Sequence, residues 1–196
     1  TTLSLNEVGD RVRGPKGTEV RLTILREGAG GTLEIKIIRD DIKVTAVSWT
    51  MVPGTNVAFL RLTQFSASAR DEIVAALKAI KAAGAEGLVL DVRNNPGGLL
   101  TQAVSVTSQF LKSGNVLQQE NAEGRRRAYR VERAGVATEI PLVVLINPGS
   151  ASSSEILAGA IQDHARGQLI GETTFGTGTV LQTFPLQDGS ALLLGT

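Results

Sequence analysis

The sequence predicts an α/β fold, because short apolar segments alternate with amphipathic segments from about residue 55 onward. Residues 88–92 and 142–146 are mostly apolar, as in strands that are buried on both faces of a parallel sheet. Residues 68–83 instead repeat apolar side chains at helical spacing. Alternation of strands and helices is typical of layered α/β domains with right-handed crossovers.

The first part of the chain, up to about residue 41, is expected to form a small β-rich structure. Residues 19–25 and 32–38 each alternate apolar with polar side chains, which indicates half-buried strands. The glycine-rich residues 28–31 between them are expected to form a hairpin loop. No helix is expected directly after this loop, so it is not a candidate phosphate-binding loop.

The remaining elements follow from the same patterns. The Ser68 and Asp71 pair is expected to cap the helix at 68–83. Val180 to Phe184 and Ala191 to Leu194 suggest a final hairpin. In chain order, the other expected elements are a strand at 57–62, a helix at 99–111, a helix from Ser152 to Asp163 and a strand at 168–171.

Composition excludes several kinds of function. The net charge of +1 gives no support to nucleic-acid binding, and the run at 125–127 is interpreted as a solvated strand edge. The chain has no cysteine and one histidine, His164, so it offers neither a thiol nucleophile nor a thiolate or histidine-rich metal site. We therefore expect no metal and no cofactor.

The chain has the features of an excised fragment. It begins inside a polar–apolar pattern and stops just after the apolar run at 191–194. No stretch reaches the roughly 18 apolar residues that a membrane-spanning helix needs, and no signal peptide is recognisable. Because both ends are expected to be cuts, this absence gives no information about where the parent protein is located.

Two predicted strand ends carry unusual residues, and sites in α/β sheets lie at the carboxyl ends of strands. Residues 147–152 form a glycine- and serine-rich turn before a helix, where a hydroxyl can act as a nucleophile. The spacing of Ser152 and Glu155 also fits an ordinary capping box, and for this turn alone the capping interpretation is favoured. At the other strand end, Gly97 and Gly98 could present backbone N–H groups as an oxyanion hole or form a simple turn.

A third glycine-rich segment makes a family resemblance specific. DVRNNPGGLL at 91–100, NPGSASSSEI at 147–156 and GETTFGTG at 171–178 together resemble the carboxyl-terminal processing peptidases, also called tail-specific proteases. RGPKGT at 13–18 and the strands after it are similar to the second half of the PDZ domain that these proteins carry. The resemblance covers nearly the whole chain.

The resemblance implies two domains. Residues 1–45 would be the C-terminal part of a PDZ domain, and residues 46–196 a core related to the Clp protease and crotonase scaffolds, truncated at its C-terminal end. Proteins of this family cut other proteins near their C-termini outside the cytoplasm, in the periplasm or at a membrane. The implied partners are protein or peptide C-termini, bound by the PDZ domain through strand addition. An edge exposed by the cut could also pair with another copy and give a homo-oligomer.

The resemblance also assigns roles to individual residues. Ser152 would be the nucleophile, and the oxyanion donors would be the N–H of Ser153 and that of Gly97 or Gly98, with Gly98 favoured. The general base of the family is a lysine, and its position here is Thr177. A glutamine normally orients that lysine.

The position of that glutamine is occupied here by Leu181. Gln182, one step along, could replace it only if a bulge restores its direction, since one step on a strand reverses the side chain.

A threonine hydroxyl is far too weak a base to replace lysine, and this leaves three interpretations open. The protein could be a working peptidase whose base comes from elsewhere, a weakly active or inactive member that binds peptides, or, least favoured, an enzyme of crotonase-like acyl chemistry. His164 lies about three helical turns beyond Ser152 and is interpreted as a helix C-terminal residue. The lysines are expected on other elements: Lys43, Lys78, Lys81 and Lys112.

Overall fold

The computed structural model describes residues 4–26, 28, 30–41, 45–133 and 135–195. Contacts within the chain divide it into two compact units, Thr1–Val44 and Thr45–Thr196. The second unit contains the α/β sheet and all of the candidate site residues.

The first unit contains helix α1 (Leu5–Val12) and the antiparallel strands β1 (Glu19–Leu25) and β2 (Thr32–Ile38). Both strands agree with the predicted ranges, although part of the predicted loop at 28–31 lies outside the described residues. The helix was not predicted, and the segment contains it in addition to the two predicted strands. Its signal is local: Ser4 and Glu7 form a capping box in which the Ser4 N–H donates to the Glu7 carboxylate at 2.8 Å.

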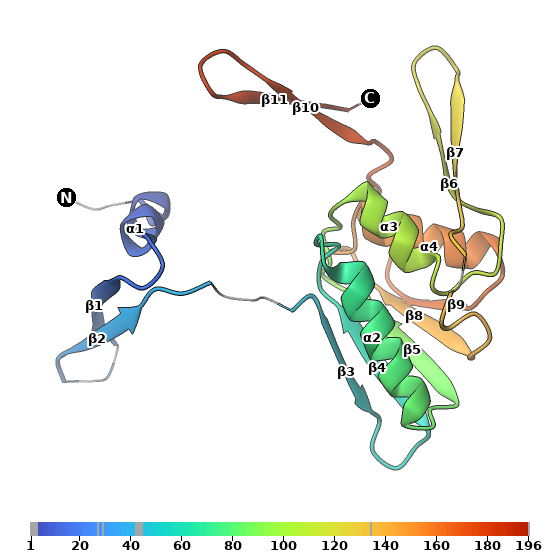
Figure 1. Cartoon of the computed structure of the whole chain (residues 1–196), viewed down its shortest axis with the longest axis horizontal. Coiled ribbons are helices and arrows are strands. Elements are labelled where there is room, and N and C mark those ends of the chain that lie inside the picture. The colour runs from blue at the N-terminus through green and yellow to red at the C-terminus, as the bar shows by residue number, and fades with distance from the viewer. Residues whose placement is uncertain (1–3, 27, 29, 42–44, 134, 196) are drawn as a thin grey trace. The chain divides into compact units, whose positions relative to one another are not determined.

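The second unit is built on a five-stranded sheet with the order β3-β4-β5-β8-β9 (Figure 1). The last four strands in this order are parallel, and β3 runs antiparallel to β4 at one edge. Four of the five were predicted, and the edge strand β3 was not. Their bounds are β3 (Val47–Met51), β4 (Val57–Leu62), β5 (Gly87–Asp91), β8 (Leu142–Ile146) and β9 (Gln168–Gly171).

Three helices lie side by side against the sheet: α2 (Ala69–Ala82), α3 (Leu100–Thr107) and α4 (Ser153–Asp163). Helix α3 contacts both α2 and α4, α2 contacts β3 and β4, and α4 contacts β9 (Figure 1). Apolar side chains from these helices and from alternate positions of the strands form one continuous core. The largest fully buried members include Phe65, Phe110, Leu60, Ile73, Leu90, Leu157 and Ile161.

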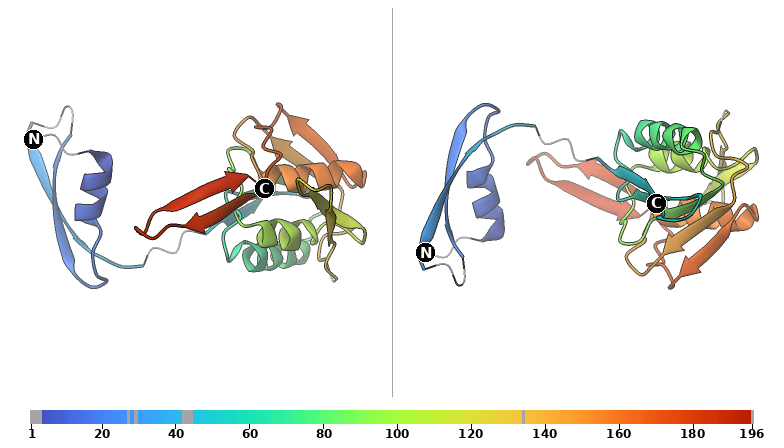
Figure 2. Two further views of the ribbon diagram at one scale, coloured as in Figure 1. Left: turned by 90° about the horizontal axis from the view of Figure 1, so that it is seen from above. Right: turned by 90° about the horizontal axis from the view of Figure 1, so that it is seen from below.

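Two antiparallel hairpins stand apart from the main sheet, as both views of Figure 2 show for the last one. They are β6 (Asn115–Glu120) with β7 (Arg126–Arg130), and β10 (Leu181–Pro185) with β11 (Ala191–Gly195). The arginine run at 125–127 lies at the start of β7, and all three side chains are exposed. Two of them pair with Glu120 and Glu123 of their own hairpin, in agreement with a solvated edge.

The start of α2 and the end of α3 differ from the prediction. Ser68 does not cap α2 through Asp71, because its backbone is already helical and its hydroxyl donates instead to Glu72 at 2.6 Å. The helix predicted at 99–111 ends at Thr107 and continues as tight turns to Phe110. Among the described residues, we find no helix that is long and apolar enough to cross a membrane.

Candidate active site

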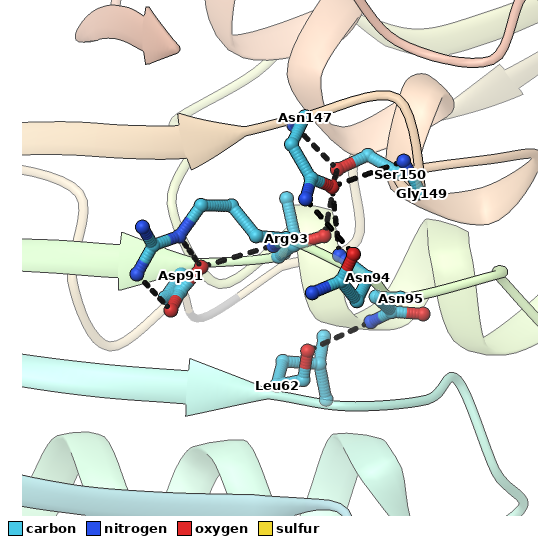
Figure 3. Close-up of polar contacts among 9 residues, drawn as sticks. Leu62, Asp91, Arg93, Asn94, Asn95, Asn147, Gly149 and Ser150 are labelled. Atoms are coloured by element: carbon cyan, nitrogen blue, oxygen red, sulfur yellow. Dashed lines mark hydrogen bonds and ion pairs between the residues drawn. The ribbon is translucent and has the colours of Figure 1, made fainter. Parts of the chain in front are cut away.

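The carboxyl ends of the neighbouring strands β5 and β8 are tied together by side-chain amides (Figure 3). The Asn94 N–H donates to Oδ1 of Asn147 at 2.8 Å, and Nδ2 of Asn147 donates to Oδ1 of Asn94 at 2.9 Å. Beside this pair, the Ser150 hydroxyl donates to the Val92 carbonyl at 2.8 Å. The turn after each strand is therefore held against the other turn, and the two predicted strand-end motifs form one site.

An ion pair between the buried Asp91 and the half-exposed Arg93 lies at the end of β5 (Figure 3). Asp91 is fully buried, and its two carboxylate oxygens accept from Nε and Nη2 of Arg93, each at 2.9 Å. Burial raises the pKa of Asp91, but the hydrogen bonds and charge of Arg93 outweigh it, so that this pKa lies below its usual value. Asp91 is therefore ionised and engaged, which suits it to holding the turn rather than accepting a proton.

Ser152 occupies a strained turn between β8 and α4. Its backbone has φ 53° and ψ −113°, a region that residues with a side chain rarely adopt. Such strain persists only where the surroundings enforce it, and it occurs at the exposed nucleophile of strand–turn–helix motifs. The conformation of Ser152 is the local feature that most clearly separates it from the other serines of this turn.

The hydroxyls of the four serines in this turn and at the start of α4 differ in what they bond. Those of Ser150, Ser153 and Ser154 each donate to a backbone carbonyl, at 2.8, 3.1 and 2.9 Å. Within the described part of the chain, the Ser152 hydroxyl donates no hydrogen bond. Its proton is therefore the one that a base could remove without breaking the turn.

Gly97 and Gly98 lie next to the turn at residues 147–152, which we call the serine turn. A Cβ placed on Gly97 would lie 2.8 Å from the Ser152 Cβ and 2.9 Å from the Ser153 nitrogen, so only glycine permits this approach. Gly97 and Gly98 also have φ of 99° and 148°, which favour glycine. Together these features explain why two glycines occur in sequence at this point.

The backbone N–H groups of the glycines and of Ser153 are not equivalent. The Gly97 N–H donates to Oδ1 of Asn95 at 2.9 Å and is therefore occupied. Among the described residues, the N–H groups of Gly98 and Ser153 have no acceptor. Ser153 is the first residue of α4, where the helix dipole favours negative charge. The pair Gly98 and Ser153 can therefore bind an oxyanion beside Ser152.

Glu155 links the serine turn to the third glycine-rich segment. Its Oε2 accepts from the N–H groups of Ser152 at 2.7 Å and Thr177 at 3.1 Å. Its Oε1 accepts from the Thr174 hydroxyl at 2.8 Å and the Gly176 N–H at 2.6 Å. The structure thus brings Thr177 beside Ser152, although the two are far apart in sequence.

The sequence showed Glu155 only as half of a capping box, and its contacts with residues 174–177 were missed. Burial raises the pKa of Glu155, but the hydrogen bonds that it accepts, with the Gly176 N–H first among them, outweigh burial and lower that pKa below 4.5. The carboxylate is therefore charged at neutral pH, and it is the charged form that accepts all four hydrogen bonds.

Replacing Glu155 by glutamine is expected to destabilise the folded protein by about 1.5–3 kcal/mol at pH 7, because an amide presents a donor to N–H groups that need an acceptor. Since the native pKa of Glu155 is lowered, its stabilisation is complete above the ordinary value of 4.5 and is lost as the pH falls through the native pKa. Urea unfolding of the full-length protein as a function of pH measures both effects. The stability difference from wild type should shrink below pH 4.5.

The control for this experiment is Glu86→Gln, which changes an exposed glutamate in the same way. A Glu155→Gln protein as stable as wild type at pH 7 would show that the four contacts contribute nothing.

Strand β10 begins at Leu181, the position that the orienting glutamine has in the family. Leu181 is 61% exposed and has no polar side-chain atom. The pairing of β10 with β11 runs without interruption from Leu181 to Pro185. The side chain of Gln182 lies outside the described residues, so its role as a substitute stays a prediction.

Other candidate bases lie on other elements. His164 ends α4, as predicted, and its Nε2 lies 2.9 Å from the Asn115 carbonyl oxygen. Lys78 and Lys81 belong to α2, and Lys112 pairs with Glu139 at 2.5 Å. Lys43 lies outside the described residues. Within the described ranges, no lysine or histidine makes a hydrogen bond to the turn at 147–152, and no cluster of three metal-ligating side chains occurs.

The family model that matches this chain and two of its curated relatives are all described as peptidases or proteases. The family model described as peptidase family S41 matches residues 56–196. A carboxyl-terminal-processing protease of Synechocystis sp. is 42% identical over 194 residues, which cover 97% of this chain and 45% of that protein. A carboxy-terminal-processing protease of Bartonella bacilliformis is 44% identical over 201 residues, which cover 98% of this chain and 45% of that protein. The chain thus spans about half the length of the curated relatives it matches.

Solved structures show the same fold. A photosystem II D1 C-terminal processing protease superposes with a TM-score of 0.70 at 32% identity, covering 98% of this chain and 53% of that one. A lipoprotein from Streptococcus agalactiae superposes with a TM-score of 0.64 at 20% identity over 78% of this chain and 58% of that one, which shows a likeness of fold alone.

Proposed function

The chain belongs to peptidase family S41, and we propose that the protein is a serine endopeptidase of the carboxyl-terminal processing type. The observation that carries this proposal is the arrangement around Ser152. Its strained backbone presents a hydroxyl that donates no hydrogen bond within the described residues. The N–H groups of Gly98 and Ser153, which have no acceptor among the same residues, belong to the two segments that meet beside it. The printed names of the relatives support the same reaction class.

In the proposed reaction, the Ser152 oxygen attacks a peptide carbonyl near the C-terminus of a protein substrate. The carbonyl oxygen becomes an oxyanion that accepts hydrogen bonds from Gly98 and Ser153, while the serine proton passes to a base and then to the leaving amine. The acyl-enzyme that remains is hydrolysed by water, which restores the serine. Donors fixed in advance by the fold stabilise the charge without reorganisation, and one such donor contributes roughly a factor of 10²–10³ in rate.

The base is the unusual part of this site. Thr177 occupies the position of the family lysine, and its N–H lies 3.1 Å from the same Glu155 oxygen that holds the Ser152 N–H. The position is therefore suited to proton transfer, but a threonine side chain is not a base. This observation favours a second candidate function, a weakly active or inactive member of the family that still binds peptides. Crotonase-like acyl chemistry has less support, because the Synechocystis and Bartonella relatives are both named as proteases.

The proposal extends to the organisation of the whole protein. Residues 1–45 would be the C-terminal part of a PDZ domain, and residues 46–196 would be peptidase core related to the Clp protease and crotonase scaffolds. The substrates would be proteins or peptides recognised by their C-termini. The site of action would lie outside the cytoplasm, in the periplasm or at a membrane. Formation of a homo-oligomer through exposed strand edges belongs to the same proposal.

The test is cleavage of an unstructured protein by the full-length protein, with the products identified by mass spectrometry. We expect slow cuts near the substrate C-terminus, and weaker binding once the terminal carboxyl is converted to an amide. Binding of the C-terminal peptide without any cleavage would favour the second candidate. Absence of both binding and cleavage would exclude both candidates.

A further inference from the structure

We propose that Asn95 is the positioning residue that selects the Gly98 N–H as the oxyanion donor. Asn95 is fully buried beneath the site and lies between the ends of strands β4, β5 and β8. The inference rests on the proposed function for its catalytic consequence, but the geometric assignment can be tested without any reaction. Asn95 acts through its neighbours, because both polar atoms of its side chain are bonded to the Leu62 carbonyl and the Gly97 N–H.

The Asn95 side chain is used at both ends. Its Nδ2 donates to the Leu62 carbonyl at the end of β4, and its Oδ1 accepts from the Gly97 N–H, each at 2.9 Å (Figure 3 shows the first contact). A buried amide with both ends bonded is fixed in orientation, since rotating it by half a turn would place donor against donor. The side chain therefore fixes the position of Gly97 relative to β4.

The Asn95 backbone carbonyl secures the serine turn. It accepts from the Ala151 N–H at 3.0 Å and from the Ser154 hydroxyl at 2.9 Å. These two residues are close neighbours of Ser152 on either side. The buried Asn95 thus fixes the distance between the serine turn and residues 95–98, which we call the glycine turn.

Asn95 also determines which glycine N–H is free. Oδ1 of Asn95 occupies the Gly97 N–H, while the Gly97 carbonyl accepts from the Phe65 N–H at 2.9 Å. The C=O and N–H of a trans peptide point in opposite directions. Since the Gly97 carbonyl points to Phe65, the Gly98 N–H of the same peptide unit points away from Phe65.

The peptide unit that follows Gly98 is held as well. The Leu99 N–H donates to the Phe65 carbonyl at 2.9 Å, and the Gly98 carbonyl accepts from the Ser153 hydroxyl at 3.1 Å. A side chain at Gly98 would overlap the Phe65 carbonyl, so the backbone has no freedom to shift toward it. The Gly98 N–H is therefore fixed in direction and has no acceptor among the described residues, as a preorganised oxyanion donor must be.

The experiment compares the full-length wild type with Asn95→Ala and Asn95→Asp by two independent measurements. The first is amide hydrogen exchange of Gly97 and Gly98, followed by NMR. The second is the separation of kcat from KM for cleavage of an unstructured protein. Alanine removes both side-chain contacts, whereas aspartate keeps an acceptor for the Gly97 N–H and loses only the donor to the Leu62 carbonyl.

The matched control is Ser108→Ala. Ser108 is also fully buried, donates to the Val104 carbonyl at 2.7 Å and accepts from the Glu132 N–H at 2.9 Å. It lies beyond the end of α3 and makes none of the contacts of the site. The Ser108→Ala variant therefore loses these two hydrogen bonds, while the glycine turn and the serine turn keep all of their contacts.

In wild type the Gly97 amide should exchange at least about tenfold more slowly than that of Gly98, because only the first is hydrogen-bonded. Asn95→Ala should remove this difference, and Asn95→Asp should retain it. Asn95→Ala should also lower kcat by about 10²–10³-fold with little change in KM, the loss typical of a displaced oxyanion donor. Ser108→Ala should change kcat far less.

A Gly98 amide as slow to exchange as that of Gly97 would overturn the assignment, even in an active enzyme. An equal effect of Asn95→Ala and Ser108→Ala on kcat would overturn the positioning role. If wild type cleaves nothing but shows the expected exchange pattern, the assignment of Gly98 is supported and the peptidase proposal alone fails.

Discussion

Replacing Ser152 by alanine is expected to reduce cleavage of an unstructured protein to background, a loss of roughly 10³-fold or more if wild type is active. Alanine keeps the helix start but removes the hydroxyl that we propose attacks the peptide carbonyl. The loss should appear in kcat, because the substrate contacts the unchanged surface of the site. Quantitative mass spectrometry of products from the full-length protein is the appropriate measurement.

The serine prediction needs a control for the loss of a hydroxyl elsewhere. Ser105→Ala removes a single hydrogen bond to Glu132 on the surface of α3 and leaves the strand ends intact. We expect its cleavage rate to equal that of wild type. Robust cleavage that survives Ser152→Ala would exclude Ser152 as the nucleophile.

Replacing Thr177 by lysine is expected to raise the cleavage rate by about 10²–10⁴-fold, the usual contribution of a well-placed general base. The main chain of residue 177 is already held beside Ser152 through Glu155. Partial burial of position 177 lowers the pKa of a lysine there, whereas the nearby Glu155 carboxylate raises it, and the lysine can accept the serine proton above the resulting pKa. The measurement is the initial rate of cleavage as a function of pH.

Thr177→Arg is the matched control, because arginine has a similar length and charge but does not lose its proton in proteins. The arginine variant should remain as slow as wild type. The double variant with Ser152→Ala should also be inactive. If the lysine variant gains nothing over an already active wild type, the base comes from another part of the protein or from another subunit.

Much of the fold follows from local sequence because buried parallel strands are recognisable by their apolar runs. The strands at 87–91 and 142–146 were predicted within a residue on this basis. The elements without a predicted range are helix α1, the edge strand β3 and the hairpin of β6 and β7. The residues of α1, β3 and β7 are largely exposed, whereas four of the six residues of β6 are not. In β3 the three central residues are exposed, and β7 is exposed at all but one position, so neither has an uninterrupted apolar run.

The site was only partly predictable, because its long-range hydrogen bonds are not visible in sequence. The position of strand ends placed Ser152 and the two glycines together, and the structure brings these turns into contact. Sequence did not show that Asn95 occupies the Gly97 N–H, nor that Glu155 reaches Thr177. Both contacts depend on how the turns are oriented after the sheet has formed.

The way Glu155 holds its neighbours also bears on how this site can change over evolutionary time. Gly176, Thr177 and Ser152 all reach the carboxylate through main-chain N–H groups. The identity of the side chain at 177 is therefore free to vary while the loop keeps its place. A lineage could lose or regain a proton-accepting group there by a single codon substitution, without first having to rebuild the loop that presents it.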